Sequence, residues 1–360
     1  MAQVITNLAT DVTAPVNYVM MSGLLSAARK RLPFFNGTLP GQLSKNKGSM
    51  SVQWERIENL SAVTTSLTEP TGNAAFGNGR TSVNPSVTRL NVAVAKKGNA
   101  ITLTEEIDLI QPNARAARFL EKLGQNAGES LNECAIDDWQ TGATTIRYAS
   151  NVASAAAIVT AIDSNDIKYA TNQLNRNSGM KFTTIGTGSV NIGTTPLRDS
   201  YYGICHPDVE EDIRAITGFV GVETYAGYLP TEPGEFGAVN GVRWCSTELA
   251  GIITADSGGN ASTNSIRYTT TKTACDVYDS FIYAQEAVGS VGLGENHAKQ
   301  IYKMGDRVPA VELIQHAPGS SGVADMFNEV GSLAWKAWYA MKVLNANWIV
   351  RVRTGASRLT

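Results

Sequence analysis

The feature that most constrains the fold of this chain is a long polar stretch between two strand patterns, at residues 58–89. Its 32 residues are rich in Thr, Ser, Gly, Asn and Pro and contain few large apolar side chains. Stretches without structure that exceed about 12–15 residues are uncommon inside compact domains. A long two-stranded arm with little apolar cover is only marginally stable by itself. The stretch therefore predicts an extended arm that needs a surface outside its own domain, as in a subunit of a larger assembly.

Strand patterns flank this arm on both sides. In Ser51–Ile57 the apolar residues Val52 and Trp54 alternate with polar ones, which is typical of a strand with one covered face. Residues 88–96 show the same alternation and predict a second strand. Residues 97–99 (KGN) predict a turn that leads into a third strand at residues 100–104.

The clearest helix pattern covers residues 113–139. An apolar stripe recurs there at steps of three and four residues, the spacing of one helix face, and Pro112 suits a helix start. A helix of this length would be about 40 Å long. The stripe consists of Ala116, Leu120, Leu123, Ala127, Leu131 and Cys134.

Shorter patterns complete an α+β prediction. Helices are expected at residues 16–32, 167–175 and 208–216, the second after the capping residues Ser164, Asn165 and Asp166. The apolar end, residues 332–352, predicts either a helix and then a strand at 348–352, which we favour, or two strands. Further strands or strand edges are expected at residues 201–205, 234–237, 241–244, 281–283, 287–291, 300–302 and 310–315.

Composition excludes several classes of protein. Charged residues make up 17% of the chain, and the start lacks the basic and apolar blocks of a signal peptide. The most apolar stretch, residues 152–162, is too short to span a bilayer, which requires about 20 residues. We therefore expect a soluble protein that is made in a cytoplasm. Four scattered cysteines predict buried, reduced thiols: Cys134, Cys205, Cys245 and Cys275.

Charge is distributed unevenly along the chain. Residues 1–54 carry a net charge of +4 and residues 330–360 carry +5, which leaves −11 for the rest. Basic ends on an acidic body indicate either docking between subunits or contact with the phosphates of packaged DNA. Ordinary solvated faces are the third interpretation.

No catalytic motif is present, and no catalytic, metal-ligating or cofactor-binding residue is assigned. The sequence has no phosphate-binding glycine loop, nucleophile elbow or H-E-x-x-H helix. The best enzyme-like cluster is His206 and Asp208, followed by Glu210, Glu211 and Asp212. These acids equally suit the first turn of a capped helix, where negative charge is stabilising, and we favour that structural interpretation.

Taken in order, several segments resemble one known family. They are residues 40–52 (PGQLSKNKGSMSV), residues 67–71 (LTEPT), the long helix, residues 205–214 (CHPDVEEDIR), residues 234–237 (GEFG) with 241–243 (GVR), and the tail at 335–352. The chain resembles the major capsid proteins of tailed bacteriophages related to the coliphage called N-four, which have the Hong Kong 97-type fold. The resemblance covers about residues 30–355, and it is carried by the order and spacing of the segments.

The resemblance implies a division of the chain into five parts. Residues 1–45 would be an N-terminal arm, and 46–107 the extended loop with peripheral-domain strands, its tip near residues 68–82. Residues 108–142 would hold the spine helix of the peripheral domain, 143–297 the axial domain, and 298–360 the return strands of the peripheral domain and the C-terminus. The family's usual acid–glycine step is Glu69–Pro70 here, and residues 183–198 and 254–273 are longer and more polar than the family leads us to expect.

The resemblance also implies a function and partners. The chain would be a structural protein and not an enzyme, and would assemble through hexamers and pentamers into an icosahedral shell around double-stranded DNA. Assembly would take place in the host bacterial cytoplasm, with separate scaffold, portal and decoration proteins as candidate partners. Candidate subunit-interface residues are Glu69, Arg80, Arg29, Lys30, Arg31, Glu235 and Arg243, and candidate genome-facing residues are Arg351, Arg353 and Arg358.

Two alternatives stay open at this point. A tail or decoration protein of a virion would share the polar arm and the lack of catalytic motifs. A hydrolase or metal enzyme built around His206 and Asp208 is the second alternative.

Overall fold

The structure is a computed structural model of the whole chain. It describes residues 33–41, 50–58, 60–62, 64, 84–104, 115–182, 199–224, 234–257, 275–291, 311–316, 327 and 329–357. The helix predicted at residues 16–32, the loop tip at 68–82 and the strand predicted at 300–302 lie outside these residues, as does the polar stretch at 183–198.

The largest layer is an eight-stranded mixed sheet. Its strand order is β5-β16-β11-β6-β9-β8-β7, and β10 pairs with β11 off this path. The strands are β5 (Thr145–Tyr148), β6 (Tyr201–Cys205), β7 (Val220–Gly221), β8 (Glu235–Val239), β9 (Val242–Ser246), β10 (Ile252–Ser257), β11 (Cys275–Tyr283) and β16 (Ile349–Thr354).

Both faces of this sheet are covered, which explains why its central strand is apolar throughout. One face packs against α5 (Ser164–Arg176) and α6 (Pro207–Arg214), with Tyr201 and Cys205 of β6 in that core. The other face contributes Tyr202 and Ile204 to a second core, which includes the long helix. All five residues of β6 are buried.

The long helix is α4 (Arg115–Gly142), which confirms the prediction for residues 113–139 in its described part. Leu120, Leu123, Ala127 and Leu131 are buried along one face, and Cys134 is half-buried. This face packs against a three-stranded antiparallel sheet with the order β13-β14-β4. Its strands are β13 (Val311–His316), β14 (Val330–Tyr339) and β4 (Ala95–Thr104).

The helix that we favoured at the start of residues 332–352 is wrong, because β14 occupies this region. Burial alternates residue by residue along β14, with Leu333, Trp335, Ala337 and Tyr339 buried. The i, i+3 relation of Trp335 and Trp338 suggested one helix face, but the two indoles point to opposite faces of a strand. Pairing with β4 over ten residues outweighs the local pattern.

The turn predicted at residues 97–99 is also wrong. Lys97, Gly98 and Asn99 continue β4 and pair with Ala337, Lys336 and Trp335 of β14. A Cβ on Gly98 would lie 2.6 Å from the carbonyl oxygen of Trp335, so the glycine permits a close approach of two strands and does not mark a turn.

A two-stranded hairpin and a small sheet complete the described chain. The hairpin consists of β2 (Ser51–Ile57) and β3 (Val87–Ala93), and the predicted strand at residues 88–96 is divided at Val94 between β3 and β4. The small sheet has the order β1-β12-β15, with β1 (Leu39–Gly41), β12 (Val288–Val291) and β15 (Met341–Val343). The short helix η1 (Pro33–Phe35) precedes β1.

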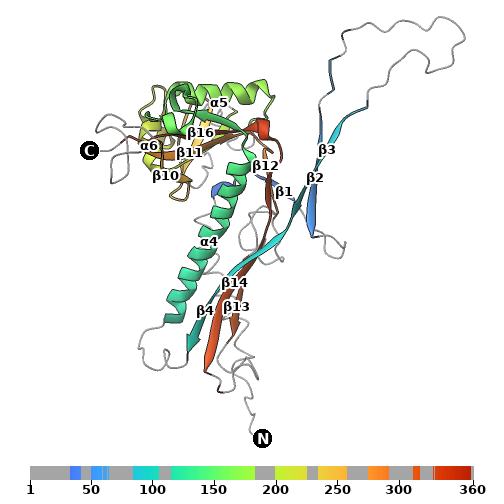
Figure 1. Cartoon of the computed structure of the whole chain (residues 1–360), viewed down its shortest axis with the longest axis vertical. Helices are drawn as coiled ribbons and strands as arrows, with labels where there is room; N and C mark the ends of the chain where they lie inside the picture. The colour runs from blue at the N-terminus through green and yellow to red at the C-terminus, as the bar shows by residue number, and fades with distance from the viewer. Residues whose placement is uncertain are drawn as a thin grey trace, which may run out of the picture.

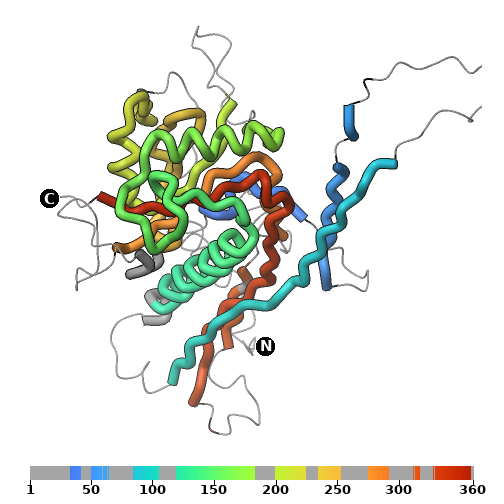
Figure 2. The backbone as a smooth tube through the Cα atoms, turned by 45° about the horizontal axis from the view of Figure 1, so that its top comes forward, coloured from blue at the N-terminus to red at the C-terminus, as the bar shows by residue number. Residues whose placement is uncertain are grey.

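The arrangement of these parts is elongated. The eight-stranded sheet with α5 and α6 forms a compact lobe at one end of α4, and the long strands β4, β13 and β14 run beside this helix (Figure 1). The β2–β3 hairpin leaves the body to one side in both views (Figures 1 and 2).

Aromatic packing joins the long helix to the lobe. Trp139 of α4 contacts Phe34, Phe281 and Tyr283 edge to face, with ring centroids 5.1, 5.6 and 4.9 Å apart. Such pairs stabilise a fold beyond the area they bury. This cluster fixes the end of α4 against β11.

The last part of the chain returns to the lobe. Strand β16 pairs with β11 and β5 in the eight-stranded sheet, and the chain reaches it from β14 through β15. The assignment of residues 298–360 to a peripheral domain stays a prediction. All four cysteines are free thiols, as predicted, and Cys205, Cys245 and Cys275 are buried.

Candidate assembly interface

The β2–β3 hairpin has two chemically different faces. The strands pair antiparallel from Ser51 opposite Ala93 to Ile57 opposite Val87. Val52 and Trp54 face the body and are buried, whereas the alternate residues of β2 are exposed. The alternation that predicted this strand therefore also assigns its two faces correctly.

The outward face carries an exposed apolar pair at its far end. Ile57 and Val87 lie directly opposite each other and are 67% and 46% exposed. The neighbouring pair on the same face is Glu55 and Arg89, whose charged groups are 3.2 Å apart and well exposed. Single exposed apolar residues are normal on a surface, but a paired set on an outstretched hairpin indicates a contact surface.

The β4 edge of the three-stranded sheet β13-β14-β4 is a second candidate contact surface. Strand β4 pairs with β14 along one edge, and no described strand pairs with its other edge. Unpaired strand edges are templates for another chain, and lysines commonly protect them. Lys96 and Lys97 lie at the start of this edge, where the Lys96 ammonium lies 4.7 Å from the centre of a ring of Trp338.

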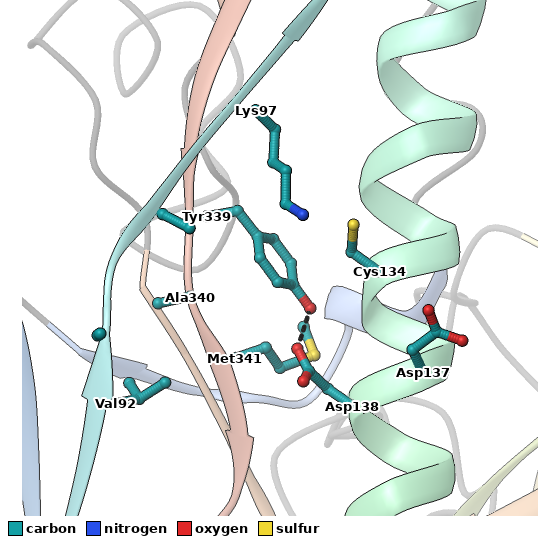
Figure 3. Close-up of a pocket in the computed structure, with 10 residues that line it drawn as sticks. Val92, Lys97, Cys134, Asp137, Asp138, Tyr339, Ala340 and Met341 are labelled. Atoms are coloured by element: carbon teal, nitrogen blue, oxygen red, sulfur yellow. Dashed lines mark hydrogen bonds between the residues drawn. The ribbon is translucent and has the colours of Figure 1, made fainter.

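A cavity of about 270 Å³ lies where the hairpin leaves the body. In Figure 3 the side chains of Lys97 from β4, Tyr339 from β14 and Asp138 from α4 face this space, and Asp137 points away from Tyr339. The Tyr339 hydroxyl donates a hydrogen bond of 2.6 Å to Asp138. This bond connects the long helix to β14.

Burial raises the pKa of three side chains that line the cavity, those of Asp138, Tyr339 and Cys134. Burial raises the pKa of Asp138, the hydrogen bond from Tyr339 lowers it, and the neighbouring Asp137 raises it again. Burial and the charge of Asp138 raise the pKa of Tyr339 far above its usual range. Burial also raises the pKa of the Cys134 thiol. Cys134 is therefore protonated near neutral pH and has little nucleophilic character.

The structure brings Glu235 and Arg243 together, but inside the subunit. Arg243 donates two hydrogen bonds to the Glu235 carboxylate, at 2.6 and 2.5 Å, and the two side chains are 2% and 0% exposed. The guanidinium also lies 5.5 Å from the centre of the Tyr202 ring. Their predicted contact with a neighbouring subunit is therefore corrected, because their own chain encloses both side chains.

The predicted genome-facing residues Arg351 and Arg353 are corrected for the same reason. Arg351 donates to Asp279 at 2.5 Å and Arg353 donates to it at 3.1 Å, and the Asp279 side chain is fully buried. Gln140 of α4 donates to the same carboxylate at 3.0 Å. These arginines connect β16, β11 and α4, so their charge is engaged within the lobe.

The other predicted interface residues, Glu69, Arg80, Arg29, Lys30 and Arg31, lie outside the described residues. The third predicted genome-facing residue, Arg358, also lies outside them.

The enzyme-like cluster is a helix cap. His206 Nδ1 accepts a hydrogen bond from the backbone N–H of Asp208, so His206 caps α6. The carboxylates have different partners: Tyr278 donates to Asp208, Arg214 to Glu210, and the backbone N–H of Ser357 to Asp212. His206 Nδ1 also lies 3.5 Å from Oδ2 of Asp208. The predicted structural role is confirmed, because Asp208 and Glu210 occupy the first turn of a capped helix, where negative charge is stabilising.

The described residues contain no group of three or more His, Cys, Asp or Glu side chains that could hold a metal ion. Within the same residues, no helix combines the length and apolar character needed to cross a membrane.

The sequence prediction missed the residues that attach the hairpin to the body. Arg56 donates a hydrogen bond of 3.2 Å to the carbonyl oxygen of Leu344, and Lys342 donates one of 3.3 Å to that of Asn91. One signal in the sequence was available. Arg56 lies on the same face of β2 as Val52 and Trp54, which is the face that packs against the body. Nothing in the sequence identified the partner carbonyls, which are about 250 or more positions away.

Comparison with solved structures shows the fold. The capsid of Ralstonia phage GP4 is similar with a TM-score of 0.59 at 10% identity, over 92% of this chain and 91% of that chain. The cyanophage P-SCSP1u capsid has a TM-score of 0.52 at 13% identity, over 91% and 89%. The cyanophage Pam1 capsid has a TM-score of 0.52 at 12% identity, over 92% and 93%. No family model matches the sequence, and no curated protein matches it.

The chain therefore has the fold of tailed-phage capsid proteins, the Hong Kong 97 type. The α+β class and the predicted resemblance are confirmed at the level of the fold, over about nine-tenths of the chain.

Proposed function

We propose that this chain is the major capsid protein of a tailed phage, a structural subunit that assembles with copies of itself into a closed icosahedral shell. The observation that carries the proposal is the outstretched β2–β3 hairpin, whose far end exposes the paired side chains of Ile57 and Val87. The likeness in fold to phage capsids over nine-tenths of the chain supports the same function.

The geometry of the hairpin favours contact with a second copy. A two-stranded ribbon needs further apolar cover for stability. Within the described part of the hairpin, Val52, Trp54, Leu90 and Val92 receive such cover from the body, whereas Ile57 and Val87 are exposed. The open edge of β4 offers another surface for a neighbouring chain. Closed rings of identical subunits, such as hexamers and pentamers, pair unlike surfaces of one chain in this way.

The proposed shell would also contact partners other than copies of this chain. The shell would enclose double-stranded DNA, with non-specific contacts to its phosphates. Arg351 and Arg353 are engaged by Asp279, so Arg358 is the remaining candidate of that group. Scaffold, portal and decoration proteins would act from separate chains, and assembly would occur in the host bacterial cytoplasm.

The predicted interface residues outside the described part remain in the proposal. Glu69, Arg80, Arg29, Lys30 and Arg31 would contact neighbouring subunits. Neutralising Arg29, Lys30 and Arg31 should reduce shell yield equally with and without DNA if they contact a subunit. A loss confined to DNA-filled shells would instead assign them to the genome.

Electron microscopy of the expressed full-length protein tests the proposal. Closed shells of uniform diameter, or hexamers and pentamers that sediment as capsomers, would support it. Rings or tubes without closed shells would select a tail protein instead. A strictly monomeric protein at high concentration would refute the proposal.

A further inference from the structure

The base of the β2–β3 hairpin stands on a small apolar cluster that is separate from the main cores. Its buried members are Val52, Trp54, Val94, Val291, Ala340 and Leu344. Trp54 is the only aromatic residue among them. Trp54 is the middle residue of β2, so a change in its contact with the body tilts the strand about this point and displaces both of its ends.

Two glycines make room for the indole of Trp54. Gly41 of β1 and Gly289 of β12 lie on the same face of a parallel strand pair, in which Leu39 is opposite Gly289 and Gly41 is opposite Val291. A Cβ on Gly41 would lie 2.5 Å from Cζ2 of Trp54, and one on Gly289 would lie 2.9 Å from it. The indole therefore rests directly on two main chains, and we call Gly41 and Gly289 the glycine seat.

The contact between Trp54 and the seat is apolar. The indole Nε1 is buried and has no hydrogen-bond partner among the described residues. Apolar contact is non-directional, so the seat determines how closely the hairpin base approaches the body. The hydrogen bonds of Arg56 to Leu344 and of Lys342 to Asn91 attach the hairpin to the body nearby.

We propose that Trp54, resting on the glycine seat, is the positioning residue that sets the direction of the hairpin relative to the body. On the proposed function, on which this step rests, the direction of the hairpin determines the angle between neighbouring subunits and hence the diameter of the shell. A side chain at Gly41 pushes the indole away by about 1 Å, since carbon atoms in contact are about 3.5 Å apart. The hairpin then tilts.

A distance measurement on the full-length chain tests the positioning directly. Spin labels are placed on Arg89→Cys in the hairpin and Lys168→Cys on α5, both exposed sites, in a Cys134→Ser background. The labelled protein is diluted with unlabelled protein, so the measurement works for free and assembled subunits. We expect one narrow distance distribution, a width at least doubled in Trp54→Ala, and a shifted maximum in Gly41→Ala.

Matched controls separate positioning from general loss of packing. Gly203→Ala creates the same kind of collision in the eight-stranded sheet, where the new Cβ would lie 2.6 Å from Cε3 of Trp244. It should leave the distance distribution unchanged. The double variant Trp54→Phe with Gly41→Ala should restore the wild-type maximum, because the smaller ring leaves room for the new methyl group.

The two proposals fail in distinguishable ways. An unchanged distribution in Trp54→Ala, with the hairpin labels still ordered, would overturn the role of Trp54 whatever particles form. A wild-type chain that never forms shells would refute the proposed function, while the distance measurement would still decide the role of Trp54. If shells form, those of Trp54→Ala should vary in diameter, and a uniform wild-type diameter would overturn the link between the hairpin and shell size.

Discussion

The eight-stranded sheet and the β2–β3 hairpin differ in how far their own chain buries their apolar and charged side chains. The sheet has cores on both faces, and its charged residues Glu235, Arg243 and Asp279 have partners within the same lobe. The hairpin has one covered face, and its far end exposes Ile57 and Val87. The first region is complete as a single chain, whereas the second offers a surface that a neighbouring subunit can cover.

This difference separates two kinds of mutational effect. Changes in the sheet should lower the free energy of unfolding of the subunit, since its interactions are internal. Changes on the outward face of the hairpin should leave the subunit stable and act on assembly.

Glu235→Gln should have the largest effect on subunit stability. It removes the carboxylate charge that Glu235 presents to the buried Arg243 guanidinium, and breaking a buried ion pair in this way costs about 3–5 kcal/mol. Chemical denaturation of the purified subunit measures the loss. A loss below about 1 kcal/mol would mean that water reaches Arg243, and the lobe would not be complete in itself.

Tyr339→Phe should have an intermediate effect. It removes the hydrogen bond to the Asp138 carboxylate and should cost about 1–2 kcal/mol at pH 7. The same change should raise the pKa of Asp138 further, because the Tyr339 hydroxyl stabilises the charged form. Chemical shifts of the Asp138 carboxyl carbon against pH would show the change. A lower pKa in the variant would contradict this assignment.

The pH dependence of stability should carry a signature of Asp138. Burial raises the folded-state pKa above the ordinary value of 3.8, so the native state binds the proton more tightly than the unfolded state. The contribution of Asp138 is therefore fully present below the unfolded pKa and is lost as the pH rises through the folded pKa. Asp138→Asn should remove this loss when unfolding curves are compared across that window. Identical pH profiles would exclude Asp138 as the source.

Glu55→Gln should have a small effect. Its partner Arg89 is exposed on the hairpin, and exposed ion pairs contribute about 0–1 kcal/mol, less at high salt. Denaturation at low and high salt measures it. A cost comparable to that of Glu235→Gln would mean that the hairpin surface is covered in the isolated subunit.

Ile57→Ser with Val87→Ser should have the smallest effect on unfolding, within about 0.5 kcal/mol, because both side chains are exposed. The same variant should abolish or strongly reduce shell formation, measured by sedimentation and electron microscopy. Val159→Ser is the matched control, since Val159 is an exposed apolar residue of the lobe, 43% exposed. Normal shells from the double variant would remove this pair from the assembly surface.

Short-range patterns in the sequence predicted several elements well. The alternation of Ser51–Ile57 predicted β2 with its bounds, and the stripe along α4 predicted the buried helix face. The helix with acids in its first turn after His206 was also predicted. In each case the signal depends on the period of one element, which neighbouring residues specify by themselves.

The predictions failed where distant segments determined the local structure. Gly98 was taken as part of a turn, but it lies in β4 because β14 approaches closely there. The tail appeared helical from the spacing of its tryptophans, but β14 forms strand pairs on both of its edges. Such pairing involves residues separated by more than 200 positions, as between β4 and β14, which local periodicity does not encode.

The sequence by itself determined the α+β class, the long helix, the hairpin strand and the absence of the common catalytic motifs. The tertiary structure alone decided which charges are paired internally, as with Arg243, Arg351 and Arg353, and that Trp54 rests on Gly41 and Gly289. The physical reason is the separation in sequence between the residues that interact. Backbone periodicity arises from residues a few positions apart, whereas an ion pair or a tight contact requires the folded chain to bring distant groups within a few ångströms.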